Sequence, residues 1–99
     1  MSVYMIIEIE ILDRATYSQY IDQVPSIVKK YGGKYLARGE EILMTMGDWH
    51  PQRVILLEFP SIEQLKKWLA SPEYVRIAPF RIRATKSKAI VIESWLEPE

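Results

Sequence analysis

The segment VYMIIEIEILDRATYSQYIDQVPSIVKKYGG, residues 3–33, predicts a strand followed by a helix and sets the frame for the rest of the chain. Residues 3–12 are rich in β-branched side chains and carry two glutamates two positions apart, which is typical of a strand. Asp13 follows as a candidate N-cap, because its carboxylate can accept hydrogen bonds from the first free amides of a helix.

The helix is predicted over residues 17–31, where apolar side chains recur every three or four positions. Gly32 and Gly33 are expected to end it. Pro25 is expected to kink it, because proline has no amide hydrogen to pair with the carbonyl of Ile21.

The remaining chain predicts three more strands and a second helical region. The strands are expected at residues 34–46, with a bulge near Gly39, at residues 53–59 and at residues 88–95. Residues 47–52 would form the loop of a long hairpin. Ser61 and Gln64 form a capping box that opens a helix, and a further short helix begins with Pro72 at its first position.

The predicted order β-α-β-β-α-β is the ferredoxin-like arrangement of the α+β class. It gives one four-stranded antiparallel sheet with both helices on one face. We assign residues 1–96 to a single domain and residues 97–99 to a tail, since a chain of 99 residues has no room for a second core.

Composition excludes several classes of function. Hydrophobic residues make up 48% of the chain, so we expect a folded domain. Thirteen basic and thirteen acidic residues give zero net charge, which provides no general attraction to nucleic acid or anionic membranes. The lack of cysteine and the single histidine argue against disulfides, thiol catalysis and a metal cluster. With no apolar run long enough to cross a membrane and no recognisable signal peptide, we expect a soluble, cytoplasmic protein.

The sheet face that both helices leave uncovered is predicted to be apolar. On the first strand it would carry Tyr4 and Ile6, and on the third strand Val54 and Leu56, while residues 88–95 are apolar on both faces. An exposed apolar surface of this size normally marks an interface. We therefore expect a homodimer in which two sheets face each other across a two-fold axis and enclose a barrel-like interior, a dimeric α/β barrel.

Charged residues interrupt this predicted face at Glu8, Glu10, Arg38, Glu58 and Glu93. Burying a charge is costly unless the charge is paired or hydrogen-bonded. Two interpretations stay open. These residues pair with one another at strand ends or across the interface, or some of them line a cleft and orient a ligand.

Chemistry-bearing motifs are scarce. The sequence has no nucleophile elbow, no glycine-rich phosphate loop and no zinc-binding helix motif. His50 lies in a loop, where it is either a surface or packing residue, or a general base or axial haem ligand. Tyr20 lies on the apolar stripe of the first helix, where it either packs with its hydroxyl at the rim or reaches a ligand.

The segment from Arg76 to Lys88 carries five basic residues and no acidic one. It is either a solvated edge or an anion site, since arginine binds carboxylate and phosphate through two parallel hydrogen bonds. RNA-recognition domains share the predicted topology, but their basic-aromatic strand motif is absent from residues 53–59. We therefore expect no nucleic-acid partner.

Several blocks of the sequence resemble a known family. They are Tyr17-x-x-Tyr20, Val24–Pro25, YGGKYLARG at residues 31–39, Gly47–Asp48–Trp49, Glu58–Phe59–Pro60–Ser61, Ser71–Pro72–Glu73–Tyr74 and Pro79-x-Arg81. In this order, over nearly the whole chain, they are similar to the family called domain of unknown function 1330 (DUF1330). The resemblance implies a dimeric α/β barrel. The wider superfamily includes cofactor-independent monooxygenases, lactone isomerases and haem-dependent enzymes, so the resemblance implies no particular activity.

The family pattern carries over to ten positions. They are Asp13, Tyr20, Gly32, Gly33, Arg38, Glu58, Pro60, Ser71, Tyr74 and Arg81. Helix caps and chain turns account for several of them, but not for the tyrosines, the arginines or Glu58. The chain departs from the pattern at Arg14, where proline is usual, and at His50, where a small residue is common. A role of His50 would therefore not be shared by the family.

Two hypotheses of function follow. In the first, the domain binds a small, partly apolar, anionic metabolite in a cleft between sheet and helices, and cofactor-independent monooxygenation or isomerisation would need no further motif. The assigned residues are Arg38 and Arg81 for the anionic group, Tyr20 and Tyr74 for hydrogen bonds, Trp68 for the apolar wall, and Glu58 or His50 for catalysis. No metal or other cofactor is expected. In the second, the protein is a non-catalytic dimerisation or stress-related scaffold whose polar residues satisfy one another.

Overall fold

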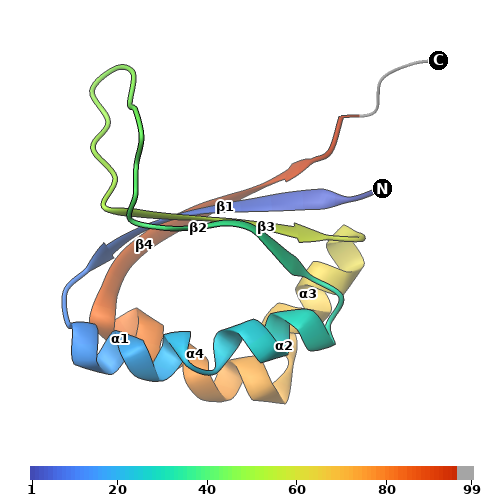
Figure 1. Cartoon of the computed structure of the whole chain (residues 1–99). Coiled ribbons are helices and arrows are strands. Elements are labelled where there is room, and N and C mark those ends of the chain that lie inside the picture. The colour runs from blue at the N-terminus through green and yellow to red at the C-terminus, as the bar shows by residue number, and fades with distance from the viewer. Residues whose placement is uncertain (96–99) are drawn as a thin grey trace.

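The computed structural model describes residues 1–95 and confirms the α+β, ferredoxin-like fold. Its elements are β1 (Val3–Ile11), α1 (Arg14–Ile21), α2 (Val24–Lys30), β2 (Lys34–Gly39), β3 (Arg53–Phe59), α3 (Ile62–Ala70), α4 (Pro72–Ala84) and β4 (Thr85–Glu93). The sheet order is β2-β3-β1-β4, and neighbouring strands are antiparallel. Figure 1 shows the four helices on one side of the sheet. The predicted tail at residues 97–99 lies outside the described residues.

Local signals set the helix ends. The Asp13 carboxylate accepts a hydrogen bond from the Thr16 amide at 3.2 Å, and the Ser61 hydroxyl accepts one from the Gln64 amide at 3.1 Å. Both predicted caps are therefore confirmed. Within residues 1–95, no helix combines the length and the apolar character needed to span a bilayer.

The first helical region differs from the prediction. The expected helix over residues 17–31 is two helices, because α1 ends at Ile21 and α2 starts at Val24. Pro25 lies in the first turn of α2, where its missing amide hydrogen costs no hydrogen bond. The proline therefore breaks the helix into two and does not simply kink one.

The second strand is also shorter than predicted. It ends at Gly39 and not at residue 46, because its neighbour in the described sheet, β3, begins at Arg53, and the last pair joins Gly39 to Val54. Residues 40–52, here called the arm, project from the sheet on the side opposite the helices (Figure 1). The bulge predicted near Gly39 lies earlier, between Tyr35 and Ala37.

The C-terminal elements have different bounds from those predicted. The helix that begins at Pro72 is not short: it continues through Pro79 to Ala84. The last strand accordingly begins at Thr85 and not at Lys88, and it ends at Glu93. As a result, three residues that were expected before the strand belong to the sheet.

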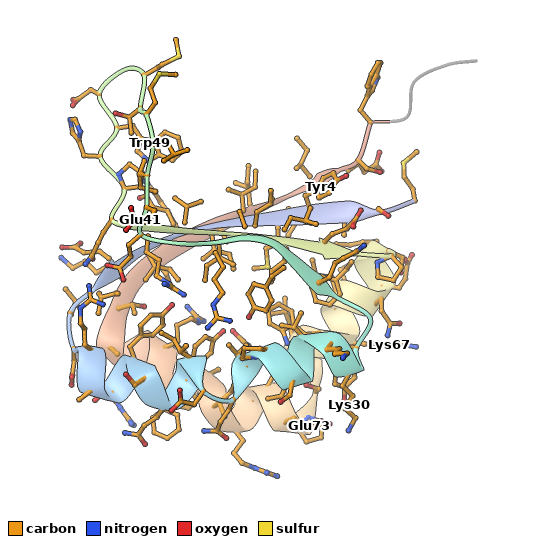
Figure 2. All side chains as sticks on the ribbon, viewed as in Figure 1. Tyr4, Lys30, Glu41, Trp49, Lys67 and Glu73 are labelled. Atoms are coloured by element: carbon orange, nitrogen blue, oxygen red, sulfur yellow. The ribbon has the colours of Figure 1, made fainter. Side chains whose placement is uncertain are left out.

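The two faces of the sheet have the predicted apolar character. On the inner face, which packs against the helices, Val3, Ile9 and Phe59 are buried. On the outer face, which points away from the helices, Ile90 and Ile92 are 60% and 52% exposed. Figure 2 shows Tyr4 on this outer side as well.

Two charged residues lie on the face opposite to the predicted one. Arg38 pairs with Ile55, and Glu93 pairs with Val3, so both belong to the inner face. The reason for Arg38 is the bulge at residues 35–37: one extra residue reverses the alternation of side chains beyond it. The prediction that Arg38 and Glu93 interrupt the outer face is therefore wrong.

Candidate functional site

A cavity of about 160 Å³ lies between the inner face of the sheet and the helices. Its apolar lining comes from Met5, Ile7, Ile9, Ile55, Leu57 and Ala89 of the sheet and from Val24, Trp68 and Leu69 of the helices. A cavity of about 150 Å³ holds a molecule the size of benzene. The space therefore fits one ring-sized apolar group.

Two tyrosines from different helices meet at this cavity. Tyr20 of α1 and Tyr74 of α4 both line it, and their hydroxyl oxygens lie 3.0 Å apart. Burial raises the pKa of Tyr20 well above its ordinary value, so its hydroxyl stays protonated at neutral pH. The pair shares one hydrogen bond, and the second hydroxyl hydrogen is left to donate to a ligand.

Arg81 brings positive charge to the same cavity. It projects from the last turn of α4, and its Nη1 donates a hydrogen bond to the Ser87 hydroxyl of β4 at 2.7 Å. Its Nε is buried and has no hydrogen-bond partner among the described residues. Lys88 also contributes to the lining, but its ammonium lies 3.7 Å from Glu8 in a pair that belongs to the outer face. Arg81 is therefore the cation that a ligand in the cavity would meet.

Tyr35 of β2 completes the polar lining, and the sequence analysis missed it. Burial raises its pKa to about 12, an effect that the charge of Arg38 partly offsets. The Arg38 guanidinium lies 5.1 Å from the centre of the Tyr35 ring. Arg38 itself is exposed and is not among the residues that line the cavity. An aromatic residue two positions after the double glycine, paired with the apolar strand β3, was the available signal.

Trp68, which was assigned to the apolar wall of the cleft, lies in the wall of the cavity. Its ring is 1% exposed and packs against Phe59 and Tyr74, with ring centres 5.3 Å and 4.6 Å away. This packing holds the indole as a rigid apolar surface.

The structure does not bring Glu58 or His50 to the cavity. Glu58 belongs to the outer face, opposite Tyr4, and its carboxylate lies 3.9 Å from the Lys34 ammonium. His50 lies on the arm, with its side chain 80% exposed and its Nε2 3.5 Å from the Asp48 carboxylate. Among the residues that line the cavity there is no aspartate, glutamate or histidine. The cavity lining therefore supplies hydrogen-bond donors and a cation but no conventional general base.

Solved structures of other proteins share this fold. A protein of unknown function from Rhodopseudomonas palustris is 22% identical, with a TM-score of 0.80, over 98% of this chain and 84% of that one. A cofactor-independent oxygenase from Streptomyces nogalater is 13% identical, with a TM-score of 0.70, over 99% of this chain and 98% of that one. A dimeric ferredoxin-like protein of unknown function from Jannaschia is 9% identical, with a TM-score of 0.68, over 95% of this chain and 100% of that one. Identities this low establish a common fold and no common activity.

Among curated proteins, none matches this sequence significantly. The family described as domain of unknown function (DUF1330) matches residues 2–95, which is almost the whole described chain. The protein therefore belongs to the DUF1330 family.

Proposed function

We propose that this protein binds a small organic anion with an apolar, ring-sized body in the cavity between sheet and helices. The observation that carries the proposal is the composition of the cavity lining: a mostly apolar wall, three tyrosines, one arginine and no carboxylate. Mostly apolar cavities with a few convergent polar groups are typical of ligand sites.

The polar groups favour an anion over a neutral or cationic ligand. The buried Nε of Arg81 has no hydrogen-bond partner among the described residues, and a buried donor without a partner is destabilising. A carboxylate, enolate or phenolate oxygen would accept this hydrogen bond and compensate the charge. The hydroxyl pair of Tyr20 and Tyr74 would donate to the same ligand from the side of α1 and α4. Trp68 would contact its apolar body.

We include in this proposal a homodimer through the outer face of the sheet. Outer-face side chains such as Ile90 and Ile92 are more than half exposed in the single chain, and burying them would supply a hydrophobic interface. The arm projects on the same side and would flank a partner seated there (Figure 1). The similar protein from Jannaschia is described as dimeric, which supports this assembly.

Whether the protein also converts the bound anion would depend on the chemistry of that ligand. The similar oxygenase from Streptomyces nogalater works without a cofactor, and both monooxygenation and isomerisation can proceed through a substrate anion. Because the cavity lining offers no carboxylate or imidazole, such a substrate would enter already deprotonated. The alternative is a non-catalytic scaffold, which predicts that no small anion affects the protein.

A ligand-induced thermal shift tests the proposal with matched probes. Benzoate, its neutral isostere benzamide and the cation benzylammonium are compared at constant ionic strength, because a ligand that binds the folded state raises Tm. We expect benzoate to give the largest shift. The variant Arg81→Met, which keeps an unbranched apolar side chain and removes the guanidinium, should lose that shift. The control Arg83→Met, at an exposed position two residues along α4, should retain it. An equal shift for benzoate and benzamide, or the same benzoate shift in Arg81→Met, would contradict the proposed site.

A further inference from the structure

Arg53 is a buried arginine that neither the sequence motifs nor the cavity lining brings to attention. It is the first residue of β3 and is 8% exposed. Its Nε has no hydrogen-bond partner among the described residues, and the Tyr17 hydroxyl is likewise buried without one. The Arg53 guanidinium lies 5.8 Å from the centre of the Tyr17 ring, so the two unpartnered groups are neighbours.

The sheet register places Arg53 between the two arginines described above. Arg53 pairs with Ile9 of β1, and Ile9 pairs on its other side with Ser87 of β4, the hydrogen-bond acceptor of Arg81. Neighbouring strands lie about 4.8 Å apart, so Arg53 and Ser87 flank Ile9 on one row of the inner face.

Arg38 reaches the same region from the edge strand. It pairs with Ile55, which is two residues beyond Arg53 on the same face of β3. Diagonal neighbours of this kind on one sheet face lie within about 7–8 Å, which long side chains bridge easily. Ile9 and Ile55 both line the cavity. Arg81 lines this end of the cavity itself, and Arg38 and Arg53 are register neighbours of the lining residues Ile55 and Ile9.

No ion pair among the described residues compensates the arginine charges at this end of the cavity. The ion pairs of the described residues do not include Arg38, Arg53 or Arg81. Glu40 is the acid whose charge interacts with Arg53, but both of its oxygens accept hydrogen bonds from Arg14, at 2.7 Å and 3.1 Å. A buried guanidinium is costly unless it is paired, and neighbouring guanidinium groups also repel one another. Among the described residues, no acid forms an ion pair with these arginines, so a bound anion would compensate their charge.

We propose that Arg38, Arg53 and Arg81, with the Tyr17 hydroxyl, form the seat of a dianionic head group, a phosphate monoester or a dicarboxylate, whose apolar body occupies the cavity. This inference rests on the proposed function and specifies its ligand class. Three guanidinium groups supply more charge than a monoanion would compensate. Arginine binds both carboxylate and phosphate in the two-pronged geometry that such a head group offers.

The test compares dianions with a monoanion on the same ring. Phenyl phosphate and phthalate are titrated against benzoate by calorimetry at about pH 8, where the second proton of a phosphate monoester, with a pKa near 6, is gone. We expect at least one dianion to bind about tenfold or more tightly than benzoate, because a second charge meets an otherwise uncompensated guanidinium. Whichever dianion binds more tightly identifies the phosphate or the dicarboxylate as the head group.

Variants then test whether the preference for a dianion over benzoate comes from the three arginines. In Arg53→Met the ratio of benzoate Kd to dianion Kd should fall to about one, because a second charge no longer gains a partner. Arg38 gives a second variant that is not expected to disturb folding, because its side chain is exposed. Arg38→Met should lower the same ratio. Arg83→Met is the matched control and should leave it unchanged. If Arg53 had only a structural role, Arg53→Met would lower the unfolding free energy and leave the ratio as it is.

The outcomes separate this inference from the proposed function. If benzoate binds and the dianions bind no more tightly, or if the ratio is the same in Arg53→Met and Arg38→Met, the three-arginine seat is wrong and the anion site at Arg81 stands. If neither benzoate nor a dianion binds the wild-type protein, both proposals fall.

Discussion

The hydroxyl oxygens of Tyr20 and Tyr74 lie 3.0 Å apart although 54 residues separate them in the chain. Their rings meet edge to face, with centres 6.1 Å apart, and each residue is 6% exposed. This contact joins α1 to α4 and places the only hydroxyl pair of the cavity lining against its apolar wall. The same two hydroxyls therefore contribute both to the packing of α1 against α4 and to the polar part of the cavity lining.

Removing either hydroxyl alone should lower the unfolding free energy, and removing both should lower it by less than the sum of the two single losses. Tyr20→Phe or Tyr74→Phe leaves the other hydroxyl buried without its partner, at a cost of about 1–3 kcal/mol of unfolding free energy. The double variant removes both polar groups and should cost less than the sum of the two. Urea unfolding of the four proteins measures this coupling. Additive losses would show that the hydroxyls do not interact.

Gly33 allows the end of α2 to approach the sheet closely. A Cβ at this position would lie 2.6 Å from the Phe59 ring and 2.8 Å from the Val28 side chain, closer than side chains tolerate. Gly33→Ala should therefore destabilise the protein by about 1–3 kcal/mol through overpacking. Combined with Phe59→Leu, which shortens the ring side, the same substitution should cost less than it does alone. Equal costs in both backgrounds would contradict a steric origin.

Glu73 gives stability a specific dependence on acid pH. The Lys30 ammonium hydrogen-bonds its carboxylate, the Tyr31 hydroxyl donates to it at 3.0 Å, and Figure 2 shows Lys30 and Glu73 side by side on the helical layer. The hydrogen bond from Lys30, followed by a backbone amide and Tyr31, lowers the pKa of Glu73 to about 2. Since the folded-state pKa lies below the unfolded one, this stabilisation is complete above about pH 4.5 and is lost as the pH falls to about 2.

Glu73→Gln should therefore flatten the fall in unfolding free energy across that pH window. Urea titrations at several pH values between these limits measure the slope. Glu63→Gln, an equivalent change in the first turn of α3, serves as the control and should keep the wild-type slope. A wild-type slope in Glu73→Gln would mean that other carboxylates dominate the acid transition.

The outer face offers a matched pair of isoleucines for testing the dimer. Ile90 on β4 and Ile82 on α4 are 60% and 63% exposed, so a charge at either position costs the single chain little. Ile90→Glu should convert a species of twice the 11.6 kDa chain mass into the monomer, because it places a carboxylate in the apolar interface. Ile82→Glu should leave the dimer intact. Sedimentation equilibrium distinguishes the two, and a wild-type mass of one chain would contradict the dimer.

Much of the fold follows from short-range physics that a sequence displays directly. The caps at Asp13 and Ser61 and the apolar character of both strand faces depend on residues within a few positions of each other. The element order and the ferredoxin-like sheet could therefore be predicted. Element bounds were less predictable: the pairing of β2 with β3 stops at Gly39 and Val54, and the sequence pattern did not indicate where it would stop.

The site depended on contacts between distant residues. Trp68, Tyr20, Tyr74 and Arg81 were predicted and do line one cavity, whereas Glu58 lies on the other face of the sheet. A single bulge at residues 35–37 moved Arg38 to the inner face, and no local pattern announces a bulge whose cause is strand pairing.

The amino-acid sequence by itself thus determined the elements, their order and the surplus of apolar side chains on the outer face, because propensity, capping and periodicity act locally. Only the tertiary structure decided which polar groups meet. Arg53 reads in the sequence as the ordinary polar start of a strand, yet the register sets it beside Tyr17 and in line with Ser87 and Arg81. Its burial with no ion pair among the described residues depends on β1, β3, β4 and α1 folding together, and that is why the proposed anion seat becomes visible only in three dimensions.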